Sequence, residues 1–445
     1  MILFIKKYIP GKAGDYHEKM STLAGFVSIT YCVRPFQTMN LQSNDIIYVI
    51  SIKTKKNKEI NMRFFKIFSV LVIMAVTTLL NSAVEKENYL KILYQKGKLH
   101  LSQKTKIDAN SLPGGVVLKQ VNDMALNKYQ QVFLTDNYQN NIKMFSPEGK
   151  FIKIIGQKGQ GPGDLMWPAS ICYNGKYMIV WEQGNDRFSF FSENGDFVKI
   201  VKPLKNLPIG NLKTIPHGNI IVETELSQDH GNKGQICSLD LYSEDFQLVR
   251  SIYKQHVMRS VYLTHPKKIN ISVPFTQDIA WDVMSNGNVV AGFQNKYEIS
   301  IFDAEKGKLF SFEHQAEPIQ ITAADKKRVY DSYRVITGPG KVKDPPKELL
   351  DKIPFPKNRP AFGKIIVDPE NNILVFPMMA AGYEQYSYVD TFAANGKFIK
   401  QVEFDPRINV PLKILFGSIA RIWCLNLDSR NEYAIINYQL EPNRE

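Results

Sequence analysis

One short hairpin recurs along the chain, and this recurrence limits the fold more than any single segment does. Each copy has an aromatic residue, a polar turn that usually contains glycine, and a second strand in which apolar and charged residues mix. The eleven-residue windows that begin at Phe145, Phe191, Tyr242, Phe302 and Phe392 read FSPEGKFIKII, FSENGDFVKIV, YSEDFQLVRSI, FDAEKGKLFSF and FAANGKFIKQV. Their starts are 46, 51, 60 and 90 residues apart. This irregular spacing predicts one all-β unit that is repeated with loops of different length.

The first complete unit shows how many strands a repeat contains. Asp123–Leu126, Gln131–Thr135, Asn141–Phe145 and Phe151–Ile155 are four short strand-like runs separated by turn-forming residues. The run Val132-Phe133-Leu134 is apolar throughout, which is typical of a strand buried on both faces. Each repeat is therefore predicted to be a four-stranded antiparallel sheet.

Six such units can be followed, and the sixth, which begins at Leu412, ends without a fourth strand. Strand-like runs at Tyr89–Tyr94 and Lys98–Ser102 are available to complete it. A ring of sheets closed by an N-terminal strand leaves only short, protected edges. The sequence thus predicts an all-β, six-bladed β-propeller with four-stranded antiparallel blades, whose N-terminal strand closes the last blade.

One stretch breaks the strand pattern. Ile321–Ile336 carries apolar residues at helical spacing behind Thr322 and Asp325, which is the signature of a capped helix. Proline-rich sequence follows, so residues 321–362 are predicted to be a helical insertion between blades 4 and 5. The insertion accounts for the 90-residue spacing and is expected to flank the ligand face.

The N-terminal region contains a hydrophobic segment inside the chain. Residues 62–83, MRFFKIFSVLVIMAVTTLLNSA, have a basic start, an apolar run and small residues at the end, the layout of a secretory signal peptide. The run is short for a membrane span, and an uncleaved signal anchor is the second interpretation. We expect translation to start at Met62, residues 1–61 to be a non-native upstream extension, and residues 84–445 to form the propeller. The protein is then exported, to the periplasm or the extracellular space.

The distribution of charge bears on nucleic-acid binding, and the number and spacing of the cysteines bear on metal binding and disulfides. The formal net charge is +13, but residues 1–83 hold 11 Lys and Arg against 4 Asp and Glu, so the predicted propeller is only mildly basic. Its basic residues are spread out rather than clustered, which argues against a nucleic-acid partner. The four cysteines form no C-x-x-C pair. We expect Cys172 and Cys424 to be buried free thiols, although one disulfide remains possible in an exported protein. We also expect a monomer that contacts a membrane only if the signal segment is not cleaved.

The first repeat and its following loop, IKMFSPEGKFIKIIGQKGQGPGDLMWP, resemble the NHL repeat. The matching positions are Phe145, Gly149, Gly156, Gly159, Gly161, Gly163, Leu165 and Pro168. Taken whole, residues from Tyr89 to Gln439 resemble the exported bacterial six-bladed propellers of the NHL and TolB-like kind, most of which have no assigned activity. The glycine-rich loop leads into a strand, not a helix, so it is interpreted as a blade connector and not as a phosphate-binding loop.

The resemblance also implies that a metal-dependent enzyme has to be considered. NHL-type propellers include a zinc-dependent lyase, and related six-bladed lactonases use calcium. Zinc needs three or four convergent ligands. The histidines of residues 84–445 do not recur at the same position of each unit, so they are not expected to converge on one zinc ion. They are His100, His217, His230, His256, His265 and His314. The carboxylates in or near inner strands, considered for calcium, are Asp136, Asp186, Asp278 and Asp368. No catalytic residue, metal site or cofactor is predicted, with calcium as the open alternative.

Aromatic residues near strand ends and connecting loops indicate a binding face better than the histidines do. The predicted ligand-binding residues are Trp167, Trp181, Glu182, Asp186, Arg187, Trp281, Tyr383 and Tyr386. The preferred function is an exported binding or scaffolding protein that recognises a protein, peptide, glycan or other small ligand on its loop face. The alternative is a hydrolase or lyase that depends on calcium or zinc in the central channel.

Overall fold

The chain divides into two units, Met1–Ser82 and Ala83–Glu445. The structure, a computed structural model, describes residues 20–21, 27–31, 50–54, 89–203, 209–227, 234–265, 267–333, 335–338, 341–344, 346–378, 385–409, 411–418, 420–427 and 432–442. In the first unit, β1 (Met20–Ser21), β2 (Val27–Tyr31) and β3 (Ile50–Thr54) form an antiparallel sheet. The sequence predicts no domain in this region. The predicted signal segment, residues 62–83, lies outside the described residues.

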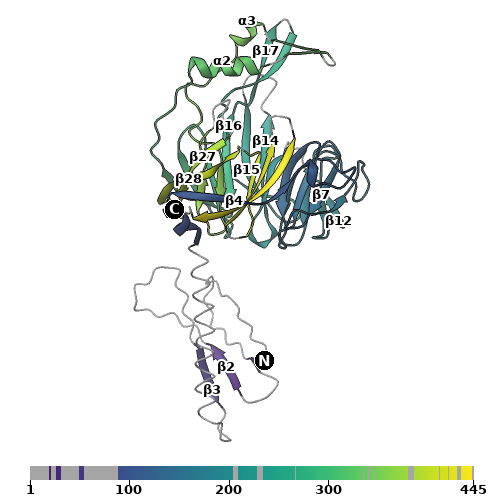
Figure 1. Cartoon of the computed structure of the whole chain (residues 1–445), viewed down its shortest axis with the longest axis vertical. Coiled ribbons are helices and arrows are strands. Elements are labelled where there is room, and N and C mark those ends of the chain that lie inside the picture. Colours follow the sequence, from purple (N-terminus) through teal and green to yellow (C-terminus); the bar gives the residue numbers. More distant parts are fainter. Residues whose placement is uncertain are drawn as a thin grey trace. The chain divides into compact units, whose positions relative to one another are not determined.

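The second unit is a six-bladed β-propeller of four-stranded antiparallel blades, as the hairpin repeat predicts. Several of its strands are labelled in Figure 1. Blade 1 has β5 (Val121–Leu126), β6 (Val132–Asp136), β7 (Asn141–Phe145) and β8 (Phe151–Ile155). Blade 2 has β9 (Pro168–Tyr173), β10 (Met178–Glu182), β11 (Arg187–Phe191) and β12 (Phe197–Val201). Blade 3 has β13 (Ile209–Thr214), β14 (Ile220–Ser227), β15 (Gln235–Tyr242) and β16 (Leu248–Val257).

Blades 4 and 5 follow the same plan, and blade 6 takes its outer strand from the N-terminal side. Blade 4 has β19 (Ile279–Val283), β20 (Val289–Phe293), β21 (Glu298–Asp303) and β22 (Gly307–Glu313). Blade 5 has β25 (Ile365–Val367), β26 (Ile373–Val375), β27 (Gln385–Phe392) and β28 (Phe398–Asn409). Blade 6 has β29 (Lys413–Phe416), β30 (Arg421–Leu427), β31 (Tyr433–Pro442) and β4 (Lys98–Ile107). Two 3-10 turns, η1 (Ala109–Ser111) and η2 (Pro216–Gly218), lie in connections.

A separate cluster of buried apolar side chains lies between each pair of neighbouring blades. Between blades 1 and 2, Phe133 and Ile142 pack with Met178 and Val180. Corresponding clusters join blades 2 and 3, 3 and 4, 4 and 5, 5 and 6, and 6 and 1. The middle strands β6, β7, β10 and β11 are buried at every position because a neighbouring blade covers each of their faces. The hydrophobic effect therefore stabilises the ring through its blade-to-blade contacts.

The recurring turn of the sequence repeat explains how one blade touches the blade before it. Gly396 has a φ of 79°, and a Cβ added there would lie 2.5 Å from Phe312 Cδ1 of blade 4. Blade 3 has no glycine at this turn. Phe246 takes the position with a φ of 55°, and its ring stacks on Phe188 of blade 2 with centroids 3.6 Å apart. The turn glycines with the same left-handed backbone are Gly149, Gly195 and Gly307.

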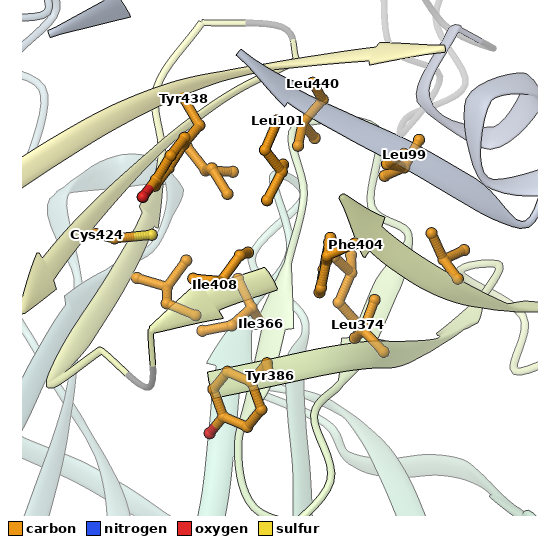
Figure 2. Packing of buried hydrophobic residues seen from close by; sticks show 14 of the residues in the cluster. Leu99, Leu101, Ile366, Leu374, Tyr386, Phe404, Ile408, Cys424, Tyr438 and Leu440 are labelled. Atoms are coloured by element: carbon orange, nitrogen blue, oxygen red, sulfur yellow. The ribbon is translucent and has the colours of Figure 1, made fainter. Parts of the chain in front are cut away.

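The N-terminal strand closes the ring as predicted. β4 pairs antiparallel with β31 along its length and parallel with β28, where Lys98 faces Glu403. Blades 5 and 6 therefore form one eight-stranded sheet. Figure 2 shows the apolar cluster beneath this junction, where Leu99 and Leu101 of β4 lie over Ile366 and Phe404 of blade 5.

The segment before β4 corrects one prediction, because residues 89–95 are helical and not a strand. Leu90, Leu93 and Tyr94 are buried on one side while Ile92 is exposed, which is the spacing of a helix face. The carboxylate of Glu370 accepts the backbone N–H of Leu90 on both oxygens, at 3.1 and 3.0 Å. The tertiary contact with blade 5 therefore favours the helix over the strand that the apolar run also allowed.

Two insertions pack against each other and form what we call the cap lobe, near the upper end of Figure 1. The predicted insertion contains α2 (Ala323–Ser332), β23 (Val335–Gly338), β24 (Lys341–Lys343) and α3 (Lys347–Leu350). The second, which the sequence analysis does not anticipate, is the hairpin of β17 (Ser260–His265) and β18 (Lys267–Ser272) between blades 3 and 4. Ile271 of the hairpin is buried with Leu349 and Ile353 of the insertion.

The start of α2 follows the capping chemistry that its sequence predicts. Thr322 Oγ1 accepts the backbone N–H of Asp325 at 3.1 Å, and the Asp325 carboxylate accepts the backbone N–H of Thr322 at 3.0 Å. Arg359 Nη2 donates to Asp325 Oδ1 at 2.6 Å. This hydrogen bond holds the pKa of Asp325 down at about 2, with the Thr322 N–H contributing.

Candidate functional site

The propeller has two faces that differ in the segments they carry. Because the strands of a blade alternate in direction, the turn between the second and third strands lies on the same side as the connection to the next blade. We call this side the connection face. The opposite side, with the first-to-second and third-to-fourth turns, is the turn face. Trp167, which precedes β9, and the turn between β10 and β11 lie at the connection face.

Two predicted ligand residues, Glu182 and Arg187, form a buried ion pair that holds the glycine-rich loop. Arg187 Nε donates to Glu182 Oε1 at 2.8 Å. The Arg187 guanidinium also donates to the carbonyls of Gln160, Gly161 and Asp164, at 2.7, 3.2 and 2.9 Å. Both charged side chains are thus occupied within the joint between blades 1 and 2.

The second Glu182 oxygen ties the end of the loop to the same pair. Glu182 Oε2 accepts the backbone N–H of Met166 at 3.0 Å and the Asn185 side-chain amide at 2.6 Å. The neighbouring blade uses a related arrangement, in which Asp136 accepts Lys143 Nζ at 2.9 Å and both side chains are fully buried. In both blades a carboxylate at the end of the second strand therefore accepts hydrogen bonds from backbone N–H groups of the segment that leads into the blade. This role of the carboxylate is structural.

Three of the predicted aromatic residues lie in the cores between blades. Trp181 packs against Phe188 with ring centroids 4.8 Å apart. Trp281 is buried between blades 3 and 4, and its Nε1 donates to Glu223 Oε2 at 3.2 Å. Tyr386 is buried between blades 5 and 6, where burial raises the pKa of its hydroxyl to about 12 (Figure 2).

The remaining predicted residues are Trp167, Asp186 and Tyr383. Trp167 is 53% exposed and its backbone N–H donates to Asn140 Oδ1 at 2.9 Å. Asp186 lies half-buried in the β10–β11 turn with a φ of 51°. Tyr383 lies outside the described residues. The structure does not bring the seven described residues together around one cavity.

A cavity of about 250 Å³ lies on the propeller axis instead, bounded by the innermost strands of all six blades. Its walls are formed by the last residues of these strands, so the cavity lies toward the turn face. None of the seven predicted ligand residues that the structure describes lines it. The lining residues at the ends of the six inner strands are Leu126, Tyr173, Thr214, Val283, Val367 and Phe416.

Two lysine–aspartate pairs link the inner strands around this cavity. Lys413 Nζ of blade 6 lies 2.6 Å from Asp123 Oδ1 of blade 1. Lys213 Nζ of blade 3 lies 2.6 Å from Asp282 Oδ1 of blade 4. In both pairs a lysine reaches the aspartate of the next blade, and the two pairs are three blades apart. In a ring of six blades this places them on opposite sides of the axis.

Each aspartate also fixes the following blade. Asp123 Oδ2 accepts the backbone N–H of Ile171 in blade 2 at 3.0 Å, and Asp282 Oδ2 accepts that of Val367 in blade 5 at 2.8 Å. Asp123 additionally accepts the Ser170 hydroxyl at 2.8 Å. The same three-blade arrangement thus occurs twice, in blades 6, 1 and 2 and in blades 3, 4 and 5.

A third lysine, Lys364, lies immediately before β25 beside these pairs. Its Nζ donates to the carbonyls of Pro411 and Leu412 at 2.6 and 2.9 Å. Burial, together with the positive charges of Lys413 and Lys213, lowers the pKa of Lys364 to about 8. Among the residues described here, no carboxylate forms an ion pair with Lys364. Lys213, Lys413 and Asp282 thus line the cavity, Asp123 pairs with Lys413, and Lys364 lies close enough to the two lysines for their charges to lower its pKa.

Three of the four carboxylates considered for calcium, Asp136, Asp278 and Asp368, have other partners. Asp278 accepts Arg259 Nε at 2.7 Å. Asp368 accepts the Tyr94 hydroxyl at 3.0 Å, and burial raises the pKa of this carboxyl to about 6. Within the described ranges no three His, Cys, Asp or Glu side chains are grouped as metal ligands would be.

The histidines are dispersed in the described part of the chain. His100 lies on β4, His217 in η2, His256 on β16 and His314 after β22. His230 is outside the described residues, as is the side chain of His265. Cys172, Cys237 and Cys424 are buried free thiols, and burial raises the pKa of Cys424 to about 12.

The axial lysines and aspartates are not apparent from the recurring hairpins, because these hairpins contain the third and fourth strands of each blade and not the first. A signal was present: the dipeptide Leu-Lys occurs as Leu212-Lys213 in the first strand of blade 3 and as Leu412-Lys413 at the start of the first strand of blade 6. Asp123 and Asp282 stand in the first strands of the blades that follow. Aligning the first strands would have placed all four side chains at the axis.

Comparison with known proteins supports the fold. The family model DUF5128, described as a 6-bladed beta-propeller, matches residues 116–203. A search of curated proteins finds no match. In the described residues no helix is both long and apolar enough to cross a membrane.

The chain is similar to several solved structures at low sequence identity. A DUF4221 family member from Bacteroides vulgatus is 11% identical, with a TM-score of 0.47, over 78% of this chain and 100% of that one. An exported-protein candidate from Bacteroides fragilis is 14% identical, with a TM-score of 0.46, over 78% and 96%. Virginiamycin B lyase from Staphylococcus aureus is 10% identical, with a TM-score of 0.36, over 77% and 95%.

Proposed function

We propose that the propeller is a non-catalytic binding protein whose small ligand occupies the axial cavity. The observation that carries this proposal is the 250 Å³ space bounded by the inner strands of all six blades, with the charged side chains of Lys213, Lys413 and Asp282 in its lining. Ligand sites are concave, largely apolar and supplied with a few polar groups that fix orientation. Here Leu126, Val283 and Phe416 supply apolar walls, and Lys213 and Lys413 supply polar groups.

The connection face is the less favoured position for this ligand. Glu182 and Arg187 have their hydrogen-bonding capacity committed to the glycine-rich loop, and Trp181 is 2% exposed. Trp167 remains as an exposed aromatic on that face. Binding of a peptide or glycan at Trp167 is the outcome that would place the site where the sequence alone predicts it.

We also propose that the protein is exported, to the periplasm or beyond. The supporting observation is the signal-like layout of residues 62–83. Fractionation of the cells that encode the protein, with N-terminal sequencing of the mature form, tests this. A mature N-terminus shortly after Ala83 in the exported fraction is expected, whereas a cytoplasmic protein that retains residues 62–83 would refute export.

The binding site can be tested by filling the cavity. We expect compounds from a panel of uncharged sugars, dipeptides and organic acids to raise the melting temperature of the full chain. Val283→Phe adds volume to the cavity wall without removing a hydrogen-bonding side chain, so it should abolish the shift. Val117→Phe, at an exposed position that does not line the cavity, is the control and should retain it.

A third variant, Trp167→Ala, distinguishes binding at the connection face from binding in the axial cavity. Loss of the shift in Trp167→Ala but not in Val283→Phe would move the site to the connection face and overturn the proposal. A shift that survives both changes would also contradict an axial site.

A further inference from the structure

The charged groups in and beside the axial cavity differ in how much hydrogen-bonding capacity they have left for a ligand. Asp123 Oδ1 accepts the backbone N–H of Met124 at 2.8 Å and faces Lys413, while Asp123 Oδ2 accepts Ser170 and Ile171. Both oxygens of this carboxylate are therefore already occupied. A cation that entered the cavity would have to displace these donors.

The opposite carboxylate is occupied in the same way. Asp282 Oδ1 accepts the backbone N–H of Val283 at 2.7 Å and Lys213 Nζ at 2.6 Å, and Asp282 Oδ2 accepts Val367. The aspartates thus orient the lysines and have little remaining capacity to bind a ligand.

The ammonium groups have donors to spare. A lysine ammonium carries three N–H donors. Lys213 and Lys413 each direct one toward an aspartate, and their side chains keep 18% and 16% exposure. Lys364 contacts two backbone carbonyls, which leave its positive charge without a neutralising partner among the described residues. With two aspartates against three lysines, the group carries a net charge of +1 when all are ionised.

Lys213 and Lys413 lie in blades 3 and 6, on opposite sides of the axis, and Lys364 lies in blade 5 near both. A ligand with one anionic group could meet the donors on one side only. A ligand with two anionic groups could receive N–H donors from both sides and would also compensate the charge of Lys364.

We propose that the axial cavity binds a small dianion, such as a short dicarboxylate, held between Lys213 and Lys413 and neutralised in part by Lys364. This inference rests on the proposed axial site and assigns its ligand class. The aspartates act as positioning residues, because they hold the two ammonium groups apart on opposite sides of the cavity.

The test uses the unmodified full chain first. Succinate, glutarate and adipate are compared by calorimetry with butyrate, pentanoate and hexanoate, and with the corresponding uncharged diols. At least one dianion should bind about tenfold or more tightly than its monoanion of equal length, because the second carboxylate gains a charge-assisted hydrogen bond. Equal affinities for dianion and monoanion would overturn the dianion assignment.

Lys364→Met tests the third positive charge without leaving an aspartate unpaired. Dianion affinity should fall several-fold in this variant and stay unchanged in the control Lys150→Met, an exposed lysine on a turn of blade 1. In the unmodified protein, affinity should also fall as the pH rises through about 8, where Lys364 loses its proton. Unchanged affinity in Lys364→Met, or the absence of this pH dependence, would remove Lys364 from the site.

The outcomes separate this inference from the proposed function. If uncharged panel compounds bind and Val283→Phe abolishes their binding, while all anions fail, the axial site stands and the dianion assignment is wrong. If dianions bind equally well to Val283→Phe, both proposals fail, because the anions bind elsewhere.

Discussion

Lys413 and Asp123 join the last blade to the first through an ion pair of 2.6 Å at the propeller axis. The pair lies at the point where the ring closes, and Asp123 extends the connection to blade 2 through the N–H of Ile171. The closure of this propeller therefore involves the inner strands as well as the outer strand β4.

Replacement of Asp123 by alanine should destabilise the ring strongly. The change leaves the Lys413 ammonium and the Ile171 N–H without their acceptor, and the loss of one partner of a largely buried pair costs about 3 kcal/mol of unfolding free energy. Asp245→Ala is the matched control, because Asp245 lies 3.7 Å from Lys199 in an exposed pair and should cost less than about 0.5 kcal/mol. Chemical denaturation measures both, and equal losses would contradict the role of Asp123 in closure.

The turn glycines allow backbone strain to be separated from crowding. Gly175→Ala places a side chain at a φ of 88° with no atom within 4 Å, so only the strain of about 1–2 kcal/mol is expected. Gly396→Ala adds to a similar strain the overlap with Phe312 of the preceding blade. Thermal unfolding should show a clearly larger loss for Gly396→Ala. Similar losses would mean that the blade-to-blade contact at this turn is easily relieved.

Arg187 should control the order of the glycine-rich loop. Arg187→Lys keeps the positive charge beside Glu182 but cannot reach all three loop carbonyls, since lysine lacks the planar fork of arginine. We expect trypsin to cleave after Lys158 much faster in this variant. Arg407→Lys, an exposed arginine on β28, is the control and should leave the cleavage rate unchanged. Slow cleavage in both variants would show that the glycine-rich loop holds its conformation without Arg187.

Asp368 should make the stability of the protein depend on pH in an unusual direction for a carboxylate. Its folded pKa is about 6, raised chiefly by burial, whereas the unfolded value is near 3.9. Between these values the folded state binds more protons, so the contribution of Asp368 to stability falls as the pH rises from about 4 to about 6. Below pH 4 both states are protonated and the effect vanishes.

Asp368→Asn isolates this contribution from all other titrations. The difference in unfolding free energy between the variant and the original protein should shift by about 2–3 kcal/mol in favour of the variant from pH 4 to pH 7. Urea denaturation at several pH values gives this difference. A constant difference would show that Asp368 titrates normally in the folded protein.

The sequence predicted the parts of the fold that repeat. Hairpin windows such as those at Phe145 and Phe392 identified the blades, and the unfinished sixth unit identified β4 as the closing strand. The strand predicted at residues 89–94 is wrong, since a short apolar run is compatible with a helix or a strand until its tertiary partner is known. Here that partner is Glu370, far away in the sequence.

The candidate site was harder to predict from the sequence than the fold. Aromatic residues such as Trp181 and Trp281 can fill a core or bind a ligand, and only their burial between blades distinguishes the two roles. Lys213 and Asp282 are ordinary strand residues by local sequence, and they become neighbours only because blades 3 and 4 are adjacent in the ring.

The double pairing of β4 has a consequence for how the protein is made. β4 is synthesised before any blade, while its partners β28 and β31 are among the last strands to be synthesised. A nascent chain can assemble separate blades, but it cannot close the ring until β31 has been added. Ring closure therefore distinguishes a chain that contains β31 from one terminated before it, which would retain an exposed β4 edge and an open seam.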